Sequence, residues 1–423
     1  MSAAAPARPA PARLYYGWVL VGVLSLTETI SYGILSYAFP VFLQPMEREL
    51  GWSRVEMTGA FSLALLVSGV VAIPFGRWVD RHGARVLMSA GSLAAALLVL
   101  AWARVGSLPA FYAIWIALGF AQAAVLYEPA FAVIATWFVR HRGRALTVLT
   151  FLAGFASVIF LPLSSRLVET LGWRSALVAL AVILVIGTFL PHVLLLRRRP
   201  ADLGLVPDGG IVAVEGAPAV HPETSVSTRD ALRSRSFRWL AAAFFLSSLT
   251  TSAVFVHLIP ALTEWGYAPA FAATATGMIG TLGLPGRLVF TPLGTRWSRP
   301  GVTAGILALQ AAGLAVLLAT SGRGGVWAFV ILFGAGFGAI TPARAALVAE
   351  YYGAANYGSI SGVLALILAV ARAAAPVGSS VLYTAAGGYS AVLWSLAGAS
   401  ALAAGAILLA EPRRRATPEV TPG

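Results

Sequence analysis

Long apolar stretches alternate with short polar breaks along most of the chain. The stretches are about 20 residues or longer, the length that an α-helix needs to cross a hydrocarbon layer of about 30 Å. Counting them predicts twelve membrane spans, at residues 16–43, 55–77, 86–104, 109–138, 145–168, 174–196, 238–263, 270–295, 302–320, 326–350, 358–385 and 389–411.

The composition supports a membrane protein. Hydrophobic residues make up 59% of the chain and charged residues only 11%, whereas about a quarter of the residues in soluble domains are charged. Helices are expected because each satisfies its own backbone hydrogen bonds in lipid. The predicted fold class is an all-α membrane protein with twelve transmembrane helices.

Residues 197–237 differ in kind from the spans. They open with three arginines and continue through Pro, Gly, Ser and Thr without periodicity. This pattern predicts a cytoplasmic linker between an N-terminal six-helix bundle (16–196) and a C-terminal six-helix bundle (238–411). Residues 1–15, rich in Ala, Pro and Arg, are expected to form a disordered cytoplasmic tail, and residues 412–423 a second cytoplasmic tail.

All 29 basic residues are arginine, and their distribution predicts the orientation. With both termini in the cytoplasm, twenty arginines lie on that side and six on the other. Cytoplasmic loops carry the excess of basic residues in membrane proteins. We therefore expect a multi-pass protein of the cytoplasmic membrane, and the net charge of +13 does not call for a nucleic-acid partner.

The two halves of the sequence echo each other. The segment "EPAFA" (128–132) corresponds to "TPARA" (341–345). Such repeats predict two pseudo-symmetric bundles with a binding site between them near the membrane midplane. Three residues between the second and third spans also recur between the eighth and ninth: Gly76, Arg81 and Gly83 return as Gly294, Arg299 and Gly301.

The segment between the second and third spans resembles the signature loop of the major facilitator superfamily. The matching residues are Gly76, Asp80, Arg81, Gly83 and Arg85, and the twelve-span architecture extends the resemblance over residues 15–411. The resemblance implies that Gly76 permits close helix contact. It also implies that Asp80 pairs with arginines and a helix N-terminus, which latches the cytoplasmic side shut in the outward-facing state.

The expected partners of this latch lie in the matching loop "RHRGR" (140–144), at Arg140, Arg142 and Arg144. A carboxylate near a helix N-terminus gains about 0.3–1 kcal/mol, which agrees with such a role. The alternative is that these charges are solvated and only set the topology.

Charged side chains at membrane depth are costly, at about 2.5–3.5 kcal/mol or more each, so they usually face a cavity and mark function. Arg287 ends a stripe of small or polar residues at helical spacing, Thr276, Gly280 and Gly283. Its planar guanidinium suits a carboxylate, which predicts a substrate anion as its ligand. The alternative is an ion pair with Glu28 or Glu128.

Arg372 follows Ala365 and Ala369 on the eleventh span and is predicted as a second anion contact. Packing near Pro376 is the alternative. Cations on spans eight and eleven are similar to the oxalate and monocarboxylate branch of the superfamily, where they hold the substrate carboxylate. The segments "YYGW" (15–18), "VHLIP" (256–260) and "PGRL" (285–288) also resemble this branch, although oxalate exchangers use Lys on span eleven.

Coupling requires a group that changes protonation. Histidine titrates near neutrality, and carboxylates in low dielectric approach that range, so Glu28, Glu128 and His257 are predicted proton carriers. A hydrogen bond to a neighbour is the alternative for His257, and salt bridges are the alternative for the two glutamates. Tyr127 and Tyr32 are predicted substrate contacts through their hydroxyls. Arg344 is expected to pair with a carboxylate.

Other classes of protein are disfavoured. The chain has no phosphate-binding loop of a nucleotide-driven pump, and "GSISG" (358–362) carries Ile360 where a hydrolase needs its nucleophile. No metal is expected, because the five histidines show no ligand spacing. No enzyme activity and no cofactor are expected either. The leading prediction is a monomeric, proton-coupled transporter of a small organic anion that works by alternating access. Proton-driven efflux of lipophilic compounds and a non-transporting receptor remain the alternatives.

Overall fold

The computed structural model describes residues 15–209 and 226–411. Within these ranges the chain forms α-helices with short π and 3-10 segments, and no β-strand. The tails expected at residues 1–15 and 412–423 lie outside the described residues, except for Tyr15, and so does the middle of the expected linker.

Six helical rods make up the first half, and four of them consist of more than one helix. In chain order these are α1 (Tyr16–Tyr32), η1 (Gly33–Tyr37) and α2 (Phe39–Leu50); α3 (Arg54–His82); α4 (Ala84–Trp102); α5 (Leu108–Val125) and α6 (Tyr127–Trp137); α7 (Arg142–Ala153) and α8 (Ala156–Leu171); α9 (Trp173–Leu184), η2 (Val185–Phe189) and α10 (Leu190–Leu195).

The linker contributes three short helical segments, and the second half contains six uninterrupted helices. The linker segments are η3 (Pro200–Leu203), η4 (Pro207–Gly209) and α11 (Thr228–Arg233). The helices of the second half are α12 (Arg235–Glu264), α13 (Pro269–Arg296), α14 (Arg299–Ala319), α15 (Arg323–Tyr352), α16 (Tyr357–Ala386) and α17 (Tyr389–Leu409).

Every predicted span coincides with one of these rods. In the described residues, eleven rods are long and apolar enough to cross a membrane. The remaining one, α13, has 28 residues and occupies the place of the predicted eighth span. The predicted all-α membrane fold of two six-helix bundles is therefore confirmed, with spans several residues longer than the apolar runs at many of the ends.

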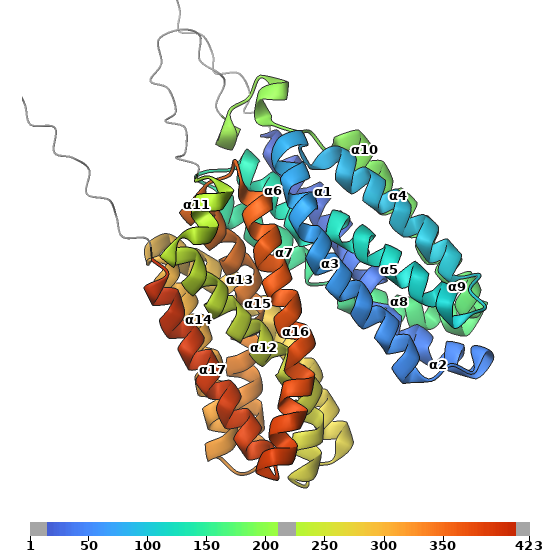
Figure 1. Ribbon diagram of the computed structural model, residues 1–423, viewed down its shortest axis with the longest axis vertical. Helices are drawn as coiled ribbons and strands as arrows, with labels where there is room; N and C mark the ends of the chain where they lie inside the picture. The colour runs from blue at the N-terminus through green and yellow to red at the C-terminus, as the bar shows by residue number, and fades with distance from the viewer. Residues whose placement is uncertain (1–14, 210–225, 412–423) are drawn as a thin grey trace, which may run out of the picture.

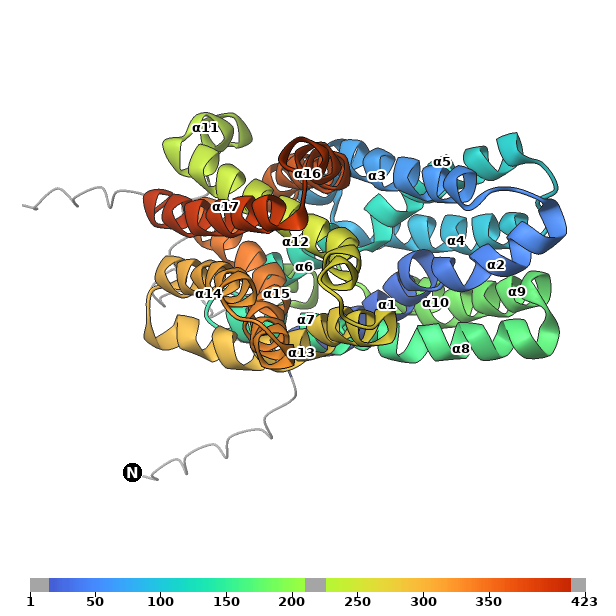
Figure 2. The same cartoon turned by 90° about the horizontal axis from the view of Figure 1, so that it is seen from below.

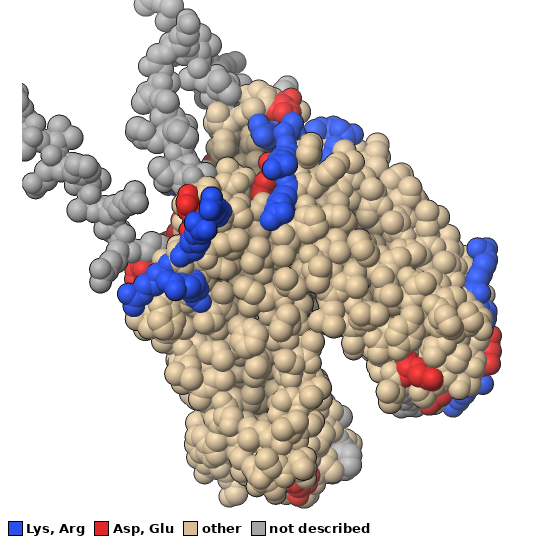
Figure 3. Space-filling model, in the orientation of Figure 1, with Lys and Arg blue, Asp and Glu red and all other residues tan. Residues whose placement is uncertain are grey.

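The two halves lie side by side (Figures 1 and 2). The end of the molecule that carries residues 196–209, together with the α3–α4 and α6–α7 turns, is called the linker side below. Figure 3 shows that the opposite end is hollowed between two lobes. The structure is thus closed on the linker side and open on the opposite side.

Helices α3 and α16 form much of the closed interface, and glycines allow them to approach closely. A Cβ atom built on Gly76 would lie 1.9 Å from the carbonyl oxygen of Gly358, and one built on Gly362 would lie 2.3 Å from that of Ala72. A side chain at either glycine would therefore force the helices apart, so the small residues set the separation of the two bundles here.

The prediction of a loop between the spans 55–77 and 86–104 is wrong. Helix α3 continues to His82 and α4 begins at Ala84, so the turn consists of Gly83 alone. Its φ of 79° is a value that glycine adopts readily. The charged residues of this segment lie on the last turns of α3 and the first turn of α4, because a helix that projects beyond the apolar layer can carry them.

Candidate functional site

A cavity of about 640 Å³ lies between the two bundles. Its walls come from α1, η1, α3, α5 and α6 in the first half and from α12 and α16 in the second. Four of the predicted site residues line it: Tyr32, Tyr127, Glu128 and Arg372. A cavity of this size can hold a small organic molecule.

A break between α5 and α6 brings Tyr127 and Glu128 to this cavity. Leu126 is extended (φ −86°, ψ −172°), and the helix restarts at Tyr127 with Pro129 in its first turn. Proline is tolerated in a first turn because its missing N–H would have no helical acceptor there. The break therefore places the Glu128 carboxylate at the positive end of α6.

Glu128 forms an ion pair across the two bundles. Its Oε1 lies 2.8 Å from Nη2 of Arg344 on α15, and its Oε2 accepts a hydrogen bond from the Ser361 hydroxyl on α16. The side chains of Arg344 and Glu128 are only 10% and 21% exposed. The prediction that Arg344 pairs with a carboxylate is confirmed.

Arg372 is the predicted cation that faces the cavity. It is exposed there, in the middle of α16, and its Nε donates to the Leu368 carbonyl of the same helix at 3.3 Å. In the part of the chain that the structure describes, no carboxylate forms an ion pair with it. Its electrostatic neighbours are Tyr32, Arg344 and Glu128. Its guanidinium is therefore available to a solute in the cavity.

Arg287 is placed differently and is not among the residues that line this cavity. Its Nε donates to the Gly338 carbonyl of α15 at 2.9 Å, and its Nη1 donates to the Thr150 carbonyl of α7. It also interacts electrostatically with Tyr127. Arg287 therefore bridges the two bundles through backbone carbonyls, next to a residue of the cavity wall.

Glu28 lies beside the two tyrosines of the cavity. It is fully buried, and neither carboxylate oxygen has a hydrogen-bond partner among the described residues. Tyr32 follows one turn later, with its ring centroid 4.7 Å from that of Tyr127. Glu128 is the charged group with which Glu28 interacts. The structure thus brings two glutamates and two tyrosines together.

His257 lies apart from this cluster. It is buried on α12, its Nε2 is 3.1 Å from the Pro376 carbonyl oxygen, and its ring centroid is 5.8 Å from that of Tyr389. Pro376 lines the cavity, whereas His257 is not among the lining residues. This geometry matches the alternative of a histidine hydrogen-bonded to a neighbouring helix.

Asp80 closes the linker side through a helix N-terminus. Its Oδ1 accepts from the Gly358 amide and its Oδ2 from the Ser359 amide, each at 2.8 Å, and Oδ2 also accepts from the Ser359 hydroxyl. These groups belong to the first turn of α16 in the other bundle. The expected contact of Asp80 with a helix N-terminus is present.

The expectation that arginines pair with Asp80 is wrong. In the described residues no arginine pairs with it. The arginines bind helix carbonyls instead, which matches the negative C-terminal end of a helix. Arg85 donates to the Val193 carbonyl at 2.6 and 3.1 Å, Arg142 donates to the Phe138 carbonyl at 2.8 Å, and the carbonyl of Arg81 accepts from Arg198.

The two remaining candidates are Arg140 in the α6–α7 turn and Arg144 in the first turn of α7. The backbone amide of Arg140 donates to Asp208 of the linker at 2.6 Å. The guanidinium of Arg144 lies 5.6 Å from the Trp18 ring centroid. Among the described residues neither side chain pairs with Asp80, whose carboxylate instead accepts from the amides at the start of α16.

Sequence reasoning missed Ser359, Ser361 and Asp208. The two serines are uncharged, so no charge pattern marked them. Asp208 lies in the linker, where acidic residues are ordinary. Its partial burial would raise its pKa, but hydrogen bonds from the amides of Arg140, His141 and Val139 outweigh this and hold the pKa below its usual value.

The structure thus has two bundles of membrane-spanning helices around a central cavity, and the comparison with known proteins agrees with this architecture. The sequence model of the Major Facilitator Superfamily matches residues 24–376. The chain belongs to this superfamily. It is therefore a transporter of a small-molecule substrate and not an enzyme.

Among relatives, this superfamily transporter is 26% identical to monocarboxylate transporter 3 of Rattus norvegicus, over all of this chain and 86% of that protein. It is 25% identical to the oxalate:formate antiporter of Oxalobacter formigenes, over 40% of each chain. The transporter FucP, solved in the outward conformation, superposes with a TM-score of 0.74 at 14% identity, over 94% of this chain and all of that one. The resemblance drawn from sequence motifs is confirmed.

Proposed function

We propose that this transporter carries a small organic anion, with monocarboxylates as the favoured class, across the cytoplasmic membrane by alternating access. The observation that carries the proposal is Arg372, a guanidinium exposed in a cavity with no carboxylate paired to it in the described residues. A cation at membrane depth is costly unless it is hydrated or paired, so a solute carboxylate is its natural ligand. The rat monocarboxylate transporter among its relatives supports this class of substrate.

The proposed orientation has both termini and the linker in the cytoplasm. The excess of arginines on that side supports it. With this orientation, the cavity opens away from the cytoplasm and the Asp80 contact closes the cytoplasmic side. The proposed transporter acts as a monomer, and its proposed substrate site is the central cavity between the two bundles.

Tyr32 and Tyr127 are proposed to orient the substrate carboxylate at Arg372. Both line the same cavity, and each hydroxyl can donate one hydrogen bond. Arg287 is proposed as the second cation, since its neighbour Tyr127 forms part of the wall. Its contact with the Thr150 carbonyl of α7 has to break when the bundles separate, which would turn the guanidinium toward the anion.

Glu28 and Glu128 are the proposed proton carriers. Glu28 is buried without a hydrogen-bond partner among the described residues, so its charge is costly there and its ionisation responds to hydration of the cavity. Glu128 is held by Arg344, and its release depends on breaking that pair. His257 is retained as a third candidate only through its contact with the cavity residue Pro376.

The substrate class is tested by transport in liposomes. Purified protein should take up small radiolabelled monocarboxylates such as lactate or formate in excess of empty liposomes, and other small carboxylates should compete. A carrier that moves hydrophobic cations while ignoring carboxylates would instead support the efflux alternative. Binding of carboxylates without any flux would support the receptor alternative.

Replacing Glu28 with glutamine should uncouple transport from the proton gradient. With an inward gradient of one pH unit, a carrier that moves one proton per anion can accumulate substrate about tenfold, since each pH unit is worth about 1.4 kcal/mol. The E28Q variant should lose this accumulation because its amide cannot carry the proton. Exchange of labelled for unlabelled substrate, which needs no net proton movement, should continue.

Gln122 provides the matched control. Like Glu28 it is fully buried, and it lines the central cavity, but its amide does not titrate. Replacing Gln122 with leucine should therefore leave the dependence on the pH gradient unchanged. Accumulation by the E28Q variant at the wild-type level would exclude Glu28 as a proton carrier and leave Glu128.

A further inference from the structure

Asp208 of the linker is held against the α6–α7 turn by more hydrogen bonds than a surface carboxylate requires. Its Oδ2 accepts from the amides of Val139 at 3.0 Å and Arg140 at 2.6 Å. Its Oδ1 accepts from the His141 amide at 3.0 Å and lies 3.2 Å from His141 Nδ1. The Asp208 side chain is only 18% exposed. The carboxylate therefore closes a turn that belongs to another part of the chain.

The backbone at Asp208 is unusual. Its φ of 64° makes it the one residue other than glycine with a positive φ in the described residues. Aspartate tolerates this conformation better than most residues, although at a cost relative to glycine. The linker thus keeps a strained residue at the position where its side chain can reach the α6–α7 turn.

The two halves obtain these contacts from different sources. The N-terminus of α16, the eleventh span, receives the Asp80 carboxylate from α3 across the interface. The corresponding position in the second half is Ser298, which caps its own helix by accepting from the Gly301 amide at 3.3 Å. Helix α7, the fifth span, therefore obtains no carboxylate from the second half at this position, and the turn before it binds Asp208 instead.

The turn that Asp208 holds leads directly into Arg142, which reaches the other bundle. Arg142 is buried, with its Nε 2.8 Å from the Phe138 carbonyl oxygen and its Nη2 3.0 Å from that of Ala135. Its Nη1 donates to the Ala349 carbonyl at the end of α15, at 3.4 Å. Fixing residues 139–141 therefore also fixes the guanidinium that crosses the interface.

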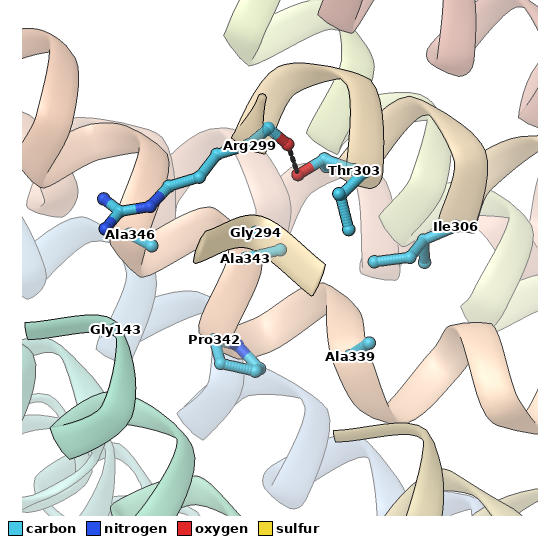
Figure 4. A pocket seen from close by; sticks show the side chains of 10 residues that line it. Gly143, Gly294, Arg299, Thr303, Ile306, Ala339, Pro342, Ala343 and Ala346 are labelled. Atoms are coloured by element: carbon cyan, nitrogen blue, oxygen red, sulfur yellow. Dashed lines mark hydrogen bonds between the residues drawn. The ribbon is translucent and has the colours of Figure 1, made fainter. Parts of the chain in front are cut away.

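The interface beside Arg142 is loosely packed, which increases the importance of this contact. A small cavity of about 40 Å³ lies between Gly143 of α7, Gly294 of α13 and the helices α14 and α15 (Figure 4). Arg299, which lines this small cavity, forms an ion pair with Glu350 of its own bundle at 3.0 Å. This contrasts with the tight contact of Gly76 with Gly358 on the other half of the interface.

We propose that Asp208 is a positioning residue of the linker-side gate: it sets the α6–α7 turn so that Arg142 meets α15, and so favours the state in which the linker side is closed. The linker then does more than join the bundles, because it supplies the carboxylate that the second half lacks. This role is independent of which substrate is carried.

The chain contains no cysteine, so single cysteines can report which side is open. Ala346→Cys, buried beside the small cavity, reports opening of the linker side. Ser62→Cys, exposed in the central cavity, reports opening of the opposite side. Asp208→Asn should raise the thiol-labelling rate at position 346 about tenfold, as expected for losing hydrogen bonds to a charged group, and lower it at position 62.

Three further variants make the result decisive. Asp208→Gly suits the positive φ but lacks the carboxylate, so it should behave like Asp208→Asn. Asp202→Asn is the matched control, because among the described residues Asp202 accepts only from the Arg199 amide of its own linker segment, at 3.2 Å, and it should leave both rates unchanged. In an Arg142→Gln background, Asp208→Asn should add little, since both act on one contact.

The outcomes separate positioning from general stability. A variant that merely unfolds would raise labelling at both positions, whereas a shifted gate moves the two rates in opposite directions. Wild-type rates in Asp208→Asn would overturn the proposal. Wild-type rates in Asp208→Gly together with altered rates in Asp208→Asn would show that backbone strain, and not the carboxylate, matters.

Discussion

Replacing Arg372 with glutamine should weaken the binding of small monocarboxylates about 100-fold, because removing one partner of a desolvated charge pair costs about 2–5 kcal/mol. The expected size of the effect rests on the position of the guanidinium, which is exposed to the central cavity and not paired with a carboxylate of the described residues. The dissociation constant can be measured by calorimetry on purified protein. Uptake at low substrate concentration should fall by a similar factor.

Two controls define this prediction. Arg372→Lys keeps the charge but loses the planar fork, so its affinity should lie between those of the wild type and the glutamine variant. Arg323, at the start of α15, lies over the Phe271 ring and outside the central cavity. Arg323→Gln removes this cation and should leave the affinity unchanged. Full affinity in the Arg372→Gln variant would refute the proposed anion contact.

Hydrophobic periodicity was enough to predict the spans and the two bundles, because the length of an apolar run is set by the thickness of the membrane. It was not enough to predict where the helices end. Helix α3 extends to His82, beyond its apolar run, because its charged last turns lie where the membrane no longer restricts composition. The same reasoning overlooked the break at Leu126, which the proline three residues later indicates.

Arg287 and Arg372 had nearly the same signal in the sequence, a cation after small residues at helical spacing. The structure separates them. On α13, Gly283 of the small stripe packs against α15, where a Cβ atom built on Gly338 would lie 1.7 Å from the Gly283 carbonyl oxygen. Small residues in a membrane helix serve close packing as readily as they leave room for a ligand. Sequence spacing shows that a stripe exists but not what lies opposite it.

The partners of the two acidic site residues illustrate the same limit. Asp80 binds the amides at the start of α16, and backbone amides carry no sequence signal. Glu128 and Arg344 were each recognised as charges at membrane depth, and Arg344 was expected to pair with a carboxylate. Only the structure identifies which one, because the two residues belong to different halves of the chain and meet through the Arg344–Glu128 ion pair.

The second large effect is expected at this ion pair. Replacing Arg344 with methionine should reduce the free energy of unfolding by about 3–5 kcal/mol, since it leaves the Glu128 carboxylate in a largely buried place without its cation. Chemical unfolding of the detergent-solubilised protein measures this loss. A matched replacement in an exposed pair, Arg299→Met opposite Glu350, should cost less than about 1 kcal/mol.

The double variant Arg344→Met with Glu128→Gln distinguishes a costly lone charge from a favourable pair. If the loss in the single variant comes from the stranded carboxylate, neutralising Glu128 should restore most of the stability, because a neutral pair of similar size costs little to bury. The restored protein would nevertheless lack a tie between α6 and α15. Thiol labelling of Ala346→Cys should therefore rise in the double variant while its stability is near that of the wild type. A double variant as unstable as Arg344→Met alone would instead show that the guanidinium stabilises the fold through contacts other than Glu128.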